Sequence, residues 1–391
     1  MFSLSQIRAD TPGCAQVLHF NNAGAALMTR QTLDATIGYL QREATMGGYE
    51  AARLAHDALE RVYDSAALLI NAHPDEIALV ENATRAWDMA FYALPFRPGD
   101  RILTSIAEYA SNYLAFLQIA RKHGVSVEPV PNDAGGQLSV EALQNLIDER
   151  VKLIAITHVP TNGGLVNPAV EVGRVARAAG VWYLLDACQS VGQLPVDVEA
   201  IGCDMLSATG RKYLRGPRGT GFLYVRRSVL AQLEPPFIDL HAATWTSRNQ
   251  FELRPDARRF ETWESNVAGR IGLGVALEYA LTLDVAQTYP RITALSSQLR
   301  TYLAAHPSVR VYDLGANPCG IVTFTVAGLD SPAVRDALFR QNINVSVTTP
   351  NHTWLDSEAR QLPAMVRASV HYYNSEAEIA SFVRAIEELA R

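Results

Sequence analysis

The stretch "VKLIAITHVPTNGGLVNPAVEVGRVARAAGVWYLLDA", residues 151–187, decides the fold class. It opens with an apolar run at 151–159, continues through an amphipathic segment at 167–180 that ends in glycine, and returns to an apolar run at 181–187. The short apolar runs predict buried strands, and the helical periodicity between them predicts a helix. Two strands joined in this way pair in parallel, with helices on both faces of the sheet.

The same alternation precedes this stretch. Strands are predicted at 101–106 and 125–130, and helices at 111–124 and 139–150. The pattern changes near residue 265. Beyond it we expect a long helix at 266–285, strands at 319–328 and 365–372, and a last helix at 375–390 that opens with the capping box Ser375/Glu378. We therefore expect a large mixed-sheet α/β domain at 26–265 and a small α+β domain made of 1–25 plus 266–391.

Composition restricts the partners. The 391 residues are 48% hydrophobic and 19% charged, which is typical of a soluble globular protein. The net charge of -6 is spread along the chain, so we expect no nucleic-acid and no membrane partner. The N-terminus has no signal-peptide pattern, and the four cysteines form no CxxC pair. These features predict a cytoplasmic protein without a metal site.

Polar residues follow several predicted strands, where parallel sheets bind their ligands. In "VENATRAW" (80–87), Thr84 and Arg85 lie between a strand and a helix, where free amides suit a phosphate or an ordinary cap forms. Asp186 ends a buried strand, and Gln189 follows it. That carboxylate could pair with a cationic ligand, for instance a protonated pyridine nitrogen, or cap the next turn.

Lys212 lies in "SATGRKYLRGPRGTG" (207–221). A lysine in a site that lowers its pKa can form a Schiff base, and Thr209 and Arg211 could donate to a phosphate. A solvated basic turn is the alternative reading of this segment. The chain contains no P-loop, no H-E-x-x-H and no G-x-S-x-G motif, and "GPRGTG" (216–221) is a poor dinucleotide-binding match.

The order of "NATRAW", "AEYASN", "ITHVPTNGGLVNP", "LLDACQSVGQLPVDV" and "GCDMLSATGRKYLRGPRGTGFLYV" resembles the class V aminotransferase family. This family comprises pyridoxal 5'-phosphate (PLP) enzymes of fold type I, the aspartate aminotransferase-like fold, and includes cysteine desulfurases, cysteine C–S lyases and isopenicillin N epimerase-like proteins. The resemblance implies a homodimer that binds PLP and acts on a small amino acid.

The resemblance also implies a role for each site residue. Lys212 would form the Schiff base, Asp186 would hold the pyridinium nitrogen and Gln189 the ring oxygen. The PLP phosphate would lie against Thr84, Arg85, Thr209 and Arg211. Tyr109 would stack on the ring where desulfurases carry a histidine. Arg367 would bind the substrate α-carboxylate, although by itself it also reads as a surface arginine on an edge strand. The resemblance assigns no role to Thr161 and Asn162.

Departures from the family pattern bear on the reaction. Desulfurases carry a nucleophilic cysteine on a loop before the arginine strand, and residues 344–363 contain none. Ser346 stands near the place of a second desulfurase arginine, and Trp263 and Glu264 stand where desulfurases lend a threonine to the partner. The sequence therefore favours a C–S lyase that cleaves a cysteine-like substrate by β-elimination without a catalytic cysteine. A class V aminotransferase, an amino-acid epimerase and a PLP-binding protein without turnover stay open as alternatives.

Overall fold

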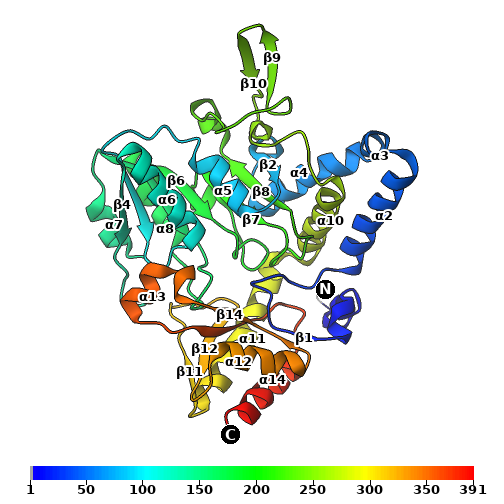
Figure 1. The fold of residues 1–391 in the computed structure, drawn as a ribbon, viewed down its shortest axis with the longest axis vertical. Helices are drawn as coiled ribbons and strands as arrows, with labels where there is room; N and C mark the ends of the chain where they lie inside the picture. The colour runs from blue at the N-terminus through cyan, green and yellow to red at the C-terminus, as the bar shows by residue number, and fades with distance from the viewer. Residues whose placement is uncertain (1–2) are drawn as a thin grey trace.

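A seven-stranded mixed sheet forms the centre of the larger part of the molecule (Figure 1). The structure is a computed structural model that describes residues 3–391. The strand order is β2 (Ile77–Val80), β8 (Gly221–Val225), β7 (Met205–Thr209), β6 (Trp182–Asp186), β5 (Val151–Thr157), β3 (Arg101–Ser105) and β4 (Ser126–Val130). The β8 strand pairs antiparallel with β2 and β7, and the other pairs in this sheet are parallel. The predicted strands at 101–106, 125–130, 151–159 and 181–187 are all present.

Helices cover both faces of this sheet because its buried strands are apolar on both sides. In β5, Ile154 and Ile156 lie in one core with Val172 of α8 (Ala169–Ala179). The intervening Leu153 and Ala155 lie in the other core, with α5 (Ala83–Phe91) and α6 (Ala110–His123). The alternation of side chains along a strand thus divides one apolar run between two cores.

The predicted helix at 139–150 is shorter in the structure, where α7 spans Val140–Leu146. The backbone of Ile147 is extended, and the carboxylate of Asp148 accepts the Arg150 N–H at 3.0 Å. Asp148 also forms an ion pair with Arg101 at 2.9 Å. These contacts give the chain a turn into β5 in place of the last helical turn.

The larger part contains further helices and strands from other segments of the sequence. They are α2 (Arg30–Met46), α3 (Gly48–Leu54), α4 (His56–Ile70), α9 (Val198–Ile201), β9 (Ala243–Ser247), β10 (Gln250–Leu253) and α10 (Val267–Leu283). The α10 helix, predicted at 266–285, packs against α2 and α4. The hairpin of β9 and β10 projects from the molecule (Figure 1), and the sequence analysis did not predict it.

The smaller part contains a four-stranded antiparallel sheet of order β11 (Val309–Val311), β12 (Ile321–Val326), β15 (Met365–Ser369) and β14 (Ser346–Thr348). Its helices are α11 (Val285–Ala305), α12 (Ser331–Arg340), α13 (Trp354–Arg360) and α14 (Glu376–Leu389). The predicted capping box opens α14: Ser375 Oγ accepts the Glu378 N–H at 3.2 Å, and Glu378 Oε2 accepts the Ser375 N–H at 3.1 Å.

The start of the described chain lies against this smaller part, as α1 (Leu4–Ala9) and β1 (Leu18–His19) show. The β1 strand pairs in parallel with β13 (Ile343–Asn344), and Arg8 forms an ion pair with Glu378 at 2.8 Å.

Within residues 3–391, no helix combines the length and the apolar character that crossing a membrane requires.

Candidate active site

A cavity of about 390 Å³ lies beyond the carboxyl ends of β5, β6 and β7, where an α/β sheet binds its ligands. Seven of the nine predicted site residues line it: Thr84, Tyr109, Asp186, Gln189, Thr209, Arg211 and Lys212. Asn112, Thr161 and Cys188 also line it. Residues from five separate segments of the sequence therefore meet at one place.

Lys212 lies in the connection between β7 and β8, directly beyond the end of β7. Burial lowers the pKa of its amine, and the nearby positive charges of Arg211 and Arg367 act in the same direction. Gly192 allows this placement. Its φ is 84°, and a Cβ there would come within 2.7 Å of the Tyr213 backbone. The turn after β6 can thus lie directly against the lysine segment.

Asp186 ends β6 and is 5% exposed. Its Oδ1 accepts the Cys188 N–H at 2.9 Å, and its Oδ2 accepts a hydrogen from Asn112 Nδ2 at 2.9 Å. Burial raises the pKa of this carboxyl, while the two hydrogen bonds oppose the rise. The carboxylate is therefore fixed at the floor of the cavity.

Sequence reasoning missed Asn112 and its neighbour Glu108. Glu108 is 3% exposed and accepts hydrogen bonds from Asn112, from Thr104, Ser105 and Thr157, and from the backbone of Tyr109 and Thr157. Burial raises its pKa to about 7. Both residues stand in "AEYASN", and their spacing of four at a helix start was the available signal.

The N-terminus of α5 opens onto the cavity, with Asn82 as its cap. Asn82 Oδ1 accepts the Arg85 N–H at 2.9 Å, and Thr84 lines the cavity. The free amides of a helix start favour an anion such as a phosphate.

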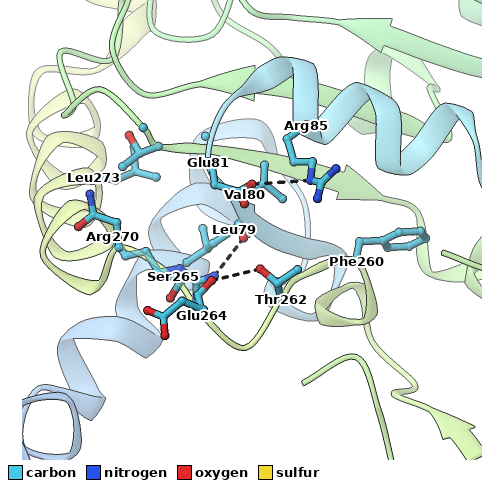
Figure 2. Close-up of a pocket in the computed structure, with 14 residues that line it drawn as sticks. Leu79, Val80, Glu81, Arg85, Phe260, Thr262, Glu264, Ser265, Arg270 and Leu273 are labelled. Carbon is cyan, nitrogen blue, oxygen red and sulfur yellow. Dashed lines mark hydrogen bonds and ion pairs between the residues drawn. The ribbon is translucent and has the colours of Figure 1, made fainter. Parts of the chain in front are cut away.

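The Arg85 side chain does not line this cavity. Its guanidinium lies 4.1 Å from the centre of the Phe237 ring and 4.0 Å from Glu81. It borders a narrower cavity beside the first one, with Thr262, Glu264 and Arg270 on the opposite wall (Figure 2). The predicted phosphate contact of Arg85 through its amide stays a prediction, since that amide already donates to Asn82.

Thr209, Arg211 and Gln189 are held by backbone carbonyls. Arg211 donates to the Gly24 carbonyl, and Thr209 donates to the Thr220 carbonyl at 3.4 Å. Gln189 donates from Nε2 to the Ala23 carbonyl at 3.2 Å, while its buried Oε1 has no hydrogen-bond partner among residues 3–391. An unpartnered buried polar atom in a cavity wall is what a bound ligand would satisfy.

Arg367, on β15, contacts the wall of the cavity through Thr161. Its Nη1 donates to Thr161 Oγ1 at 2.5 Å, and its Nε donates to Ser346 Oγ at 3.1 Å. No carboxylate within residues 3–391 forms an ion pair with it, and burial lowers its pKa to about 10. A half-buried cation without an anion loses part of its hydration without compensation, so this position suits an anionic group of a ligand. Asn162 donates to Thr353 at 3.1 Å and so ties the cavity wall to the segment before α13.

The sequence model of the aminotransferase class-V family matches residues 18–382 of this chain. The chain belongs to this family. A probable cysteine desulfurase of Methanothermobacter thermautotrophicus is 31% identical over 348 residues, which are 88% of this chain and 86% of that protein. The apo structure of a cysteine desulfurase from Thermococcus onnurineus superposes with a TM-score of 0.93 at 27% identity and covers 100% of this chain and 98% of that one.

A third relative was solved as a complex of the cystine C–S lyase C-DES with its reaction product, cysteine persulfide. It has a TM-score of 0.87 at 25% identity and covers 96% of this chain and 98% of that one. Together these findings confirm the predicted fold type I, the PLP cofactor and the assignment as a PLP-dependent class V enzyme.

The residues of the cavity fit PLP. A lysine, a buried carboxylate, the amide of Gln189 and a helix N-terminus are present together, and they match a carbonyl, a pyridine nitrogen, a ring oxygen and a phosphate. The Nε2 group of Gln189 donates one hydrogen to Ala23 and has a second one for the ring oxygen.

Proposed function

We propose that this protein is a C–S lyase that cleaves a cysteine-like amino acid or its sulfoxide by β-elimination. The observation that carries the proposal is the meeting of half-buried Lys212 and buried Asp186 in one cavity whose wall holds the unpaired Arg367. The absence of a cysteine from residues 344–363 favours elimination over persulfide transfer, because elimination needs no further nucleophile. The similarity to a cystine C–S lyase supports this choice.

Each cavity residue has a proposed task toward the cofactor. Lys212 would hold PLP covalently, and the Asp186 carboxylate would accept a hydrogen bond from its protonated ring nitrogen. Gln189 would bind the ring oxygen, and Tyr109 would cover the face of the ring. The phosphate would lie at the start of α5 beside Thr84, within reach of Thr209 and Arg211. The predicted contact with the Arg85 amide would require that amide to give up its hydrogen bond to Asn82.

When bound, PLP withdraws electrons from the substrate and makes the hydrogen on its α-carbon acidic. Arg367 would orient the substrate by binding its carboxylate with the face of the guanidinium that Thr161 and Ser346 leave free. Lys212, once its amine is free, would take the α-proton, since its lowered pKa keeps the amine unprotonated more readily than in water. The sulfur group would then leave the β-carbon.

Of the four cysteines, only Cys188 lines the cavity. Cys203 and Cys319 are fully buried, and burial raises their thiol pKa values. Cys14 lies near Arg8 in the smaller part. Burial raises the pKa of the Cys188 thiol as well. The raised pKa favours the protonated thiol, which is less nucleophilic than the thiolate.

The test is a product screen with the PLP-loaded enzyme on cysteine, cystine and cysteine sulfoxides. We expect pyruvate, ammonia and a sulfur product, and no persulfide on the protein. Borohydride reduction and peptide mapping should place the cofactor on Lys212.

Single replacements of Cys14, Cys188, Cys203 and Cys319 should leave pyruvate release intact. If Cys188→Ala abolishes turnover while PLP stays bound, a relocated desulfurase thiol replaces the elimination mechanism. A keto acid or a racemised amino acid in place of pyruvate would identify an aminotransferase or an epimerase.

We also propose a cytoplasmic homodimer. Trp263 is 59% exposed and Tyr49 is 79% exposed, and with Leu40 they line a surface cavity of about 540 Å³. Large apolar side chains that gather on one surface are typical of an interface. The segment with Trp263 also borders the narrow cavity next to Arg85, so a partner there would lie close to the active site. The four free cysteines suit a reducing compartment.

A further inference from the structure

Glu108 and Asn112 form a buried chain of hydrogen bonds that ends on Asp186. Asn112 Nδ2 donates to Glu108 Oε1 at 2.8 Å and to Asp186 Oδ2 at 2.9 Å. All three side chains are at most 5% exposed. One amide nitrogen therefore bridges two buried carboxyl groups, and Glu108 lies behind Asp186 without lining the cavity itself.

The two acceptors determine which way the Asn112 amide points. The reversed amide would place its oxygen against two carboxyl oxygens, which repel it. Glu108 Oε1 also accepts the Tyr109 N–H at 3.0 Å, and Oε2 accepts the Thr157 N–H at 2.9 Å. A backbone N–H can only donate, so each of the two Glu108 oxygens is an acceptor for one backbone donor. Oε1 therefore faces Asn112 as an acceptor as well.

Asp186 is held on its other side as well. The Cys188 N–H occupies Oδ1, and Asn112 occupies Oδ2. The carboxylate plane is then set by one backbone donor and one side-chain donor. Without Asn112, the carboxylate could rotate and would carry a larger desolvation cost, because a buried carboxylate needs its hydrogen bonds.

We propose that Glu108 is a positioning residue that acts through Asn112 to fix the Asp186 carboxylate toward the ring nitrogen of PLP. This inference rests on the proposed role of Asp186 in the cofactor site. Glu108 would touch neither cofactor nor substrate. Its task is to keep the donor side of Asn112 facing Asp186, and its six hydrogen bonds anchor it to the ends of β3 and β5 and the start of α6.

The competing explanation is that Glu108 only joins these chain segments, without any effect on the cofactor. A double-mutant cycle separates the two. The variants are Glu108→Gln, Asn112→Ala and their combination, and the quantity measured is the PLP dissociation constant of the cofactor-free protein. The visible circular dichroism of bound PLP at equal occupancy reports its orientation.

If Glu108 acts through Asn112, each single change should weaken PLP binding by roughly 10- to 100-fold, the range of a hydrogen bond to a charged group. The double variant should be no weaker than Asn112→Ala, and all three should reduce the visible circular dichroism. Glu76→Gln is the matched control: Glu76 is 4% exposed, accepts the backbone N–H of Arg227 at 2.7 Å, and lies away from the cavity. It should leave both readouts unchanged.

Effects that multiply in the double variant, or single variants with unchanged PLP binding and circular dichroism, would overturn the inference. Should Glu108→Gln not fold, Asn112→Ala alone decides, because unchanged PLP binding there removes the link to Asp186. Failure of the proposed function is distinguishable: a wild-type protein that binds PLP on Lys212 but releases no pyruvate refutes the lyase and not this inference.

Discussion

Arg367 offers the sharpest test of the active site, because its contacts predict a loss of activity without a loss of stability. Its guanidinium donates to Thr161 and Ser346 but forms no ion pair with any carboxylate among residues 3–391. The fall of its pKa from 12.5 to about 10 corresponds to about 3 kcal/mol by which burial opposes the charged form. The substitution Arg367→Met removes this charge and keeps a side chain of similar length.

We expect Arg367→Met to lower kcat/KM for the substrate by roughly 10- to 1000-fold. A charge-assisted hydrogen-bonded pair contributes about 1.5–3 kcal/mol, and loss of positioning adds to that. The melting temperature of the cofactor-free protein should not fall, because the removed desolvation cost offsets the two lost hydrogen bonds to hydroxyl groups. PLP content should stay unchanged.

The matched control is Arg300→Met. Arg300 forms an ion pair with the buried Asp313 at 2.7 Å, and its removal leaves that carboxylate without a cation. This variant should lose about 3–5 kcal/mol of stability. The measurements are pyruvate release against substrate concentration, cofactor absorbance, and thermal unfolding. Wild-type kinetics in Arg367→Met, or a loss of stability as large as that of Arg300→Met, would refute the assignment of Arg367 as the free carboxylate-binding cation.

Three other perturbations have defined outcomes. Gly192→Ala should weaken PLP binding and lower the melting temperature, since the new Cβ would lie within 2.7 Å of the Tyr213 backbone next to Lys212; unchanged absorbance and stability would contradict this. Burial lowers the pKa of His158 to about 4 from 6.5, so the unfolded chain binds a proton that the folded protein does not, and stability should fall by about 3 kcal/mol as the pH drops from about 6.5 to 4. His158→Asn should show less of this loss in unfolding curves measured at the two pH values, and an identical pH dependence would assign it to other groups. Trp263→Glu should shift the protein toward a monomer in light scattering, whereas an unchanged mass would place the interface elsewhere.

Much of the larger part could be predicted from the sequence, because its strands are short apolar runs and its helices are amphipathic. A buried parallel strand has to be apolar on both faces, and this leaves a local pattern in β5 and β6. The capping box of α14 is likewise a contact within four residues. The strands of the β9–β10 hairpin, ATWTS and QFEL, also alternate between apolar and polar residues, but they are only five and four residues long and mostly exposed, so no buried apolar run marks them.

The sequence by itself determined the family and most of the cavity: Thr84, Tyr109, Asp186, Gln189, Thr209, Arg211 and Lys212 stand at strand ends or helix starts, where chain direction alone brings them to one edge of the sheet. Only the tertiary structure decided how Arg85 and Glu108 are used. The Arg85 side chain turns toward Phe237, a contact between residues far apart in the chain. In the bridge from Glu108 through Asn112 to Asp186, the hydrogen bond between Asn112 and Asp186 joins residues 74 positions apart. No local pattern encodes a hydrogen bond that forms only when the start of α6 packs against the end of β6.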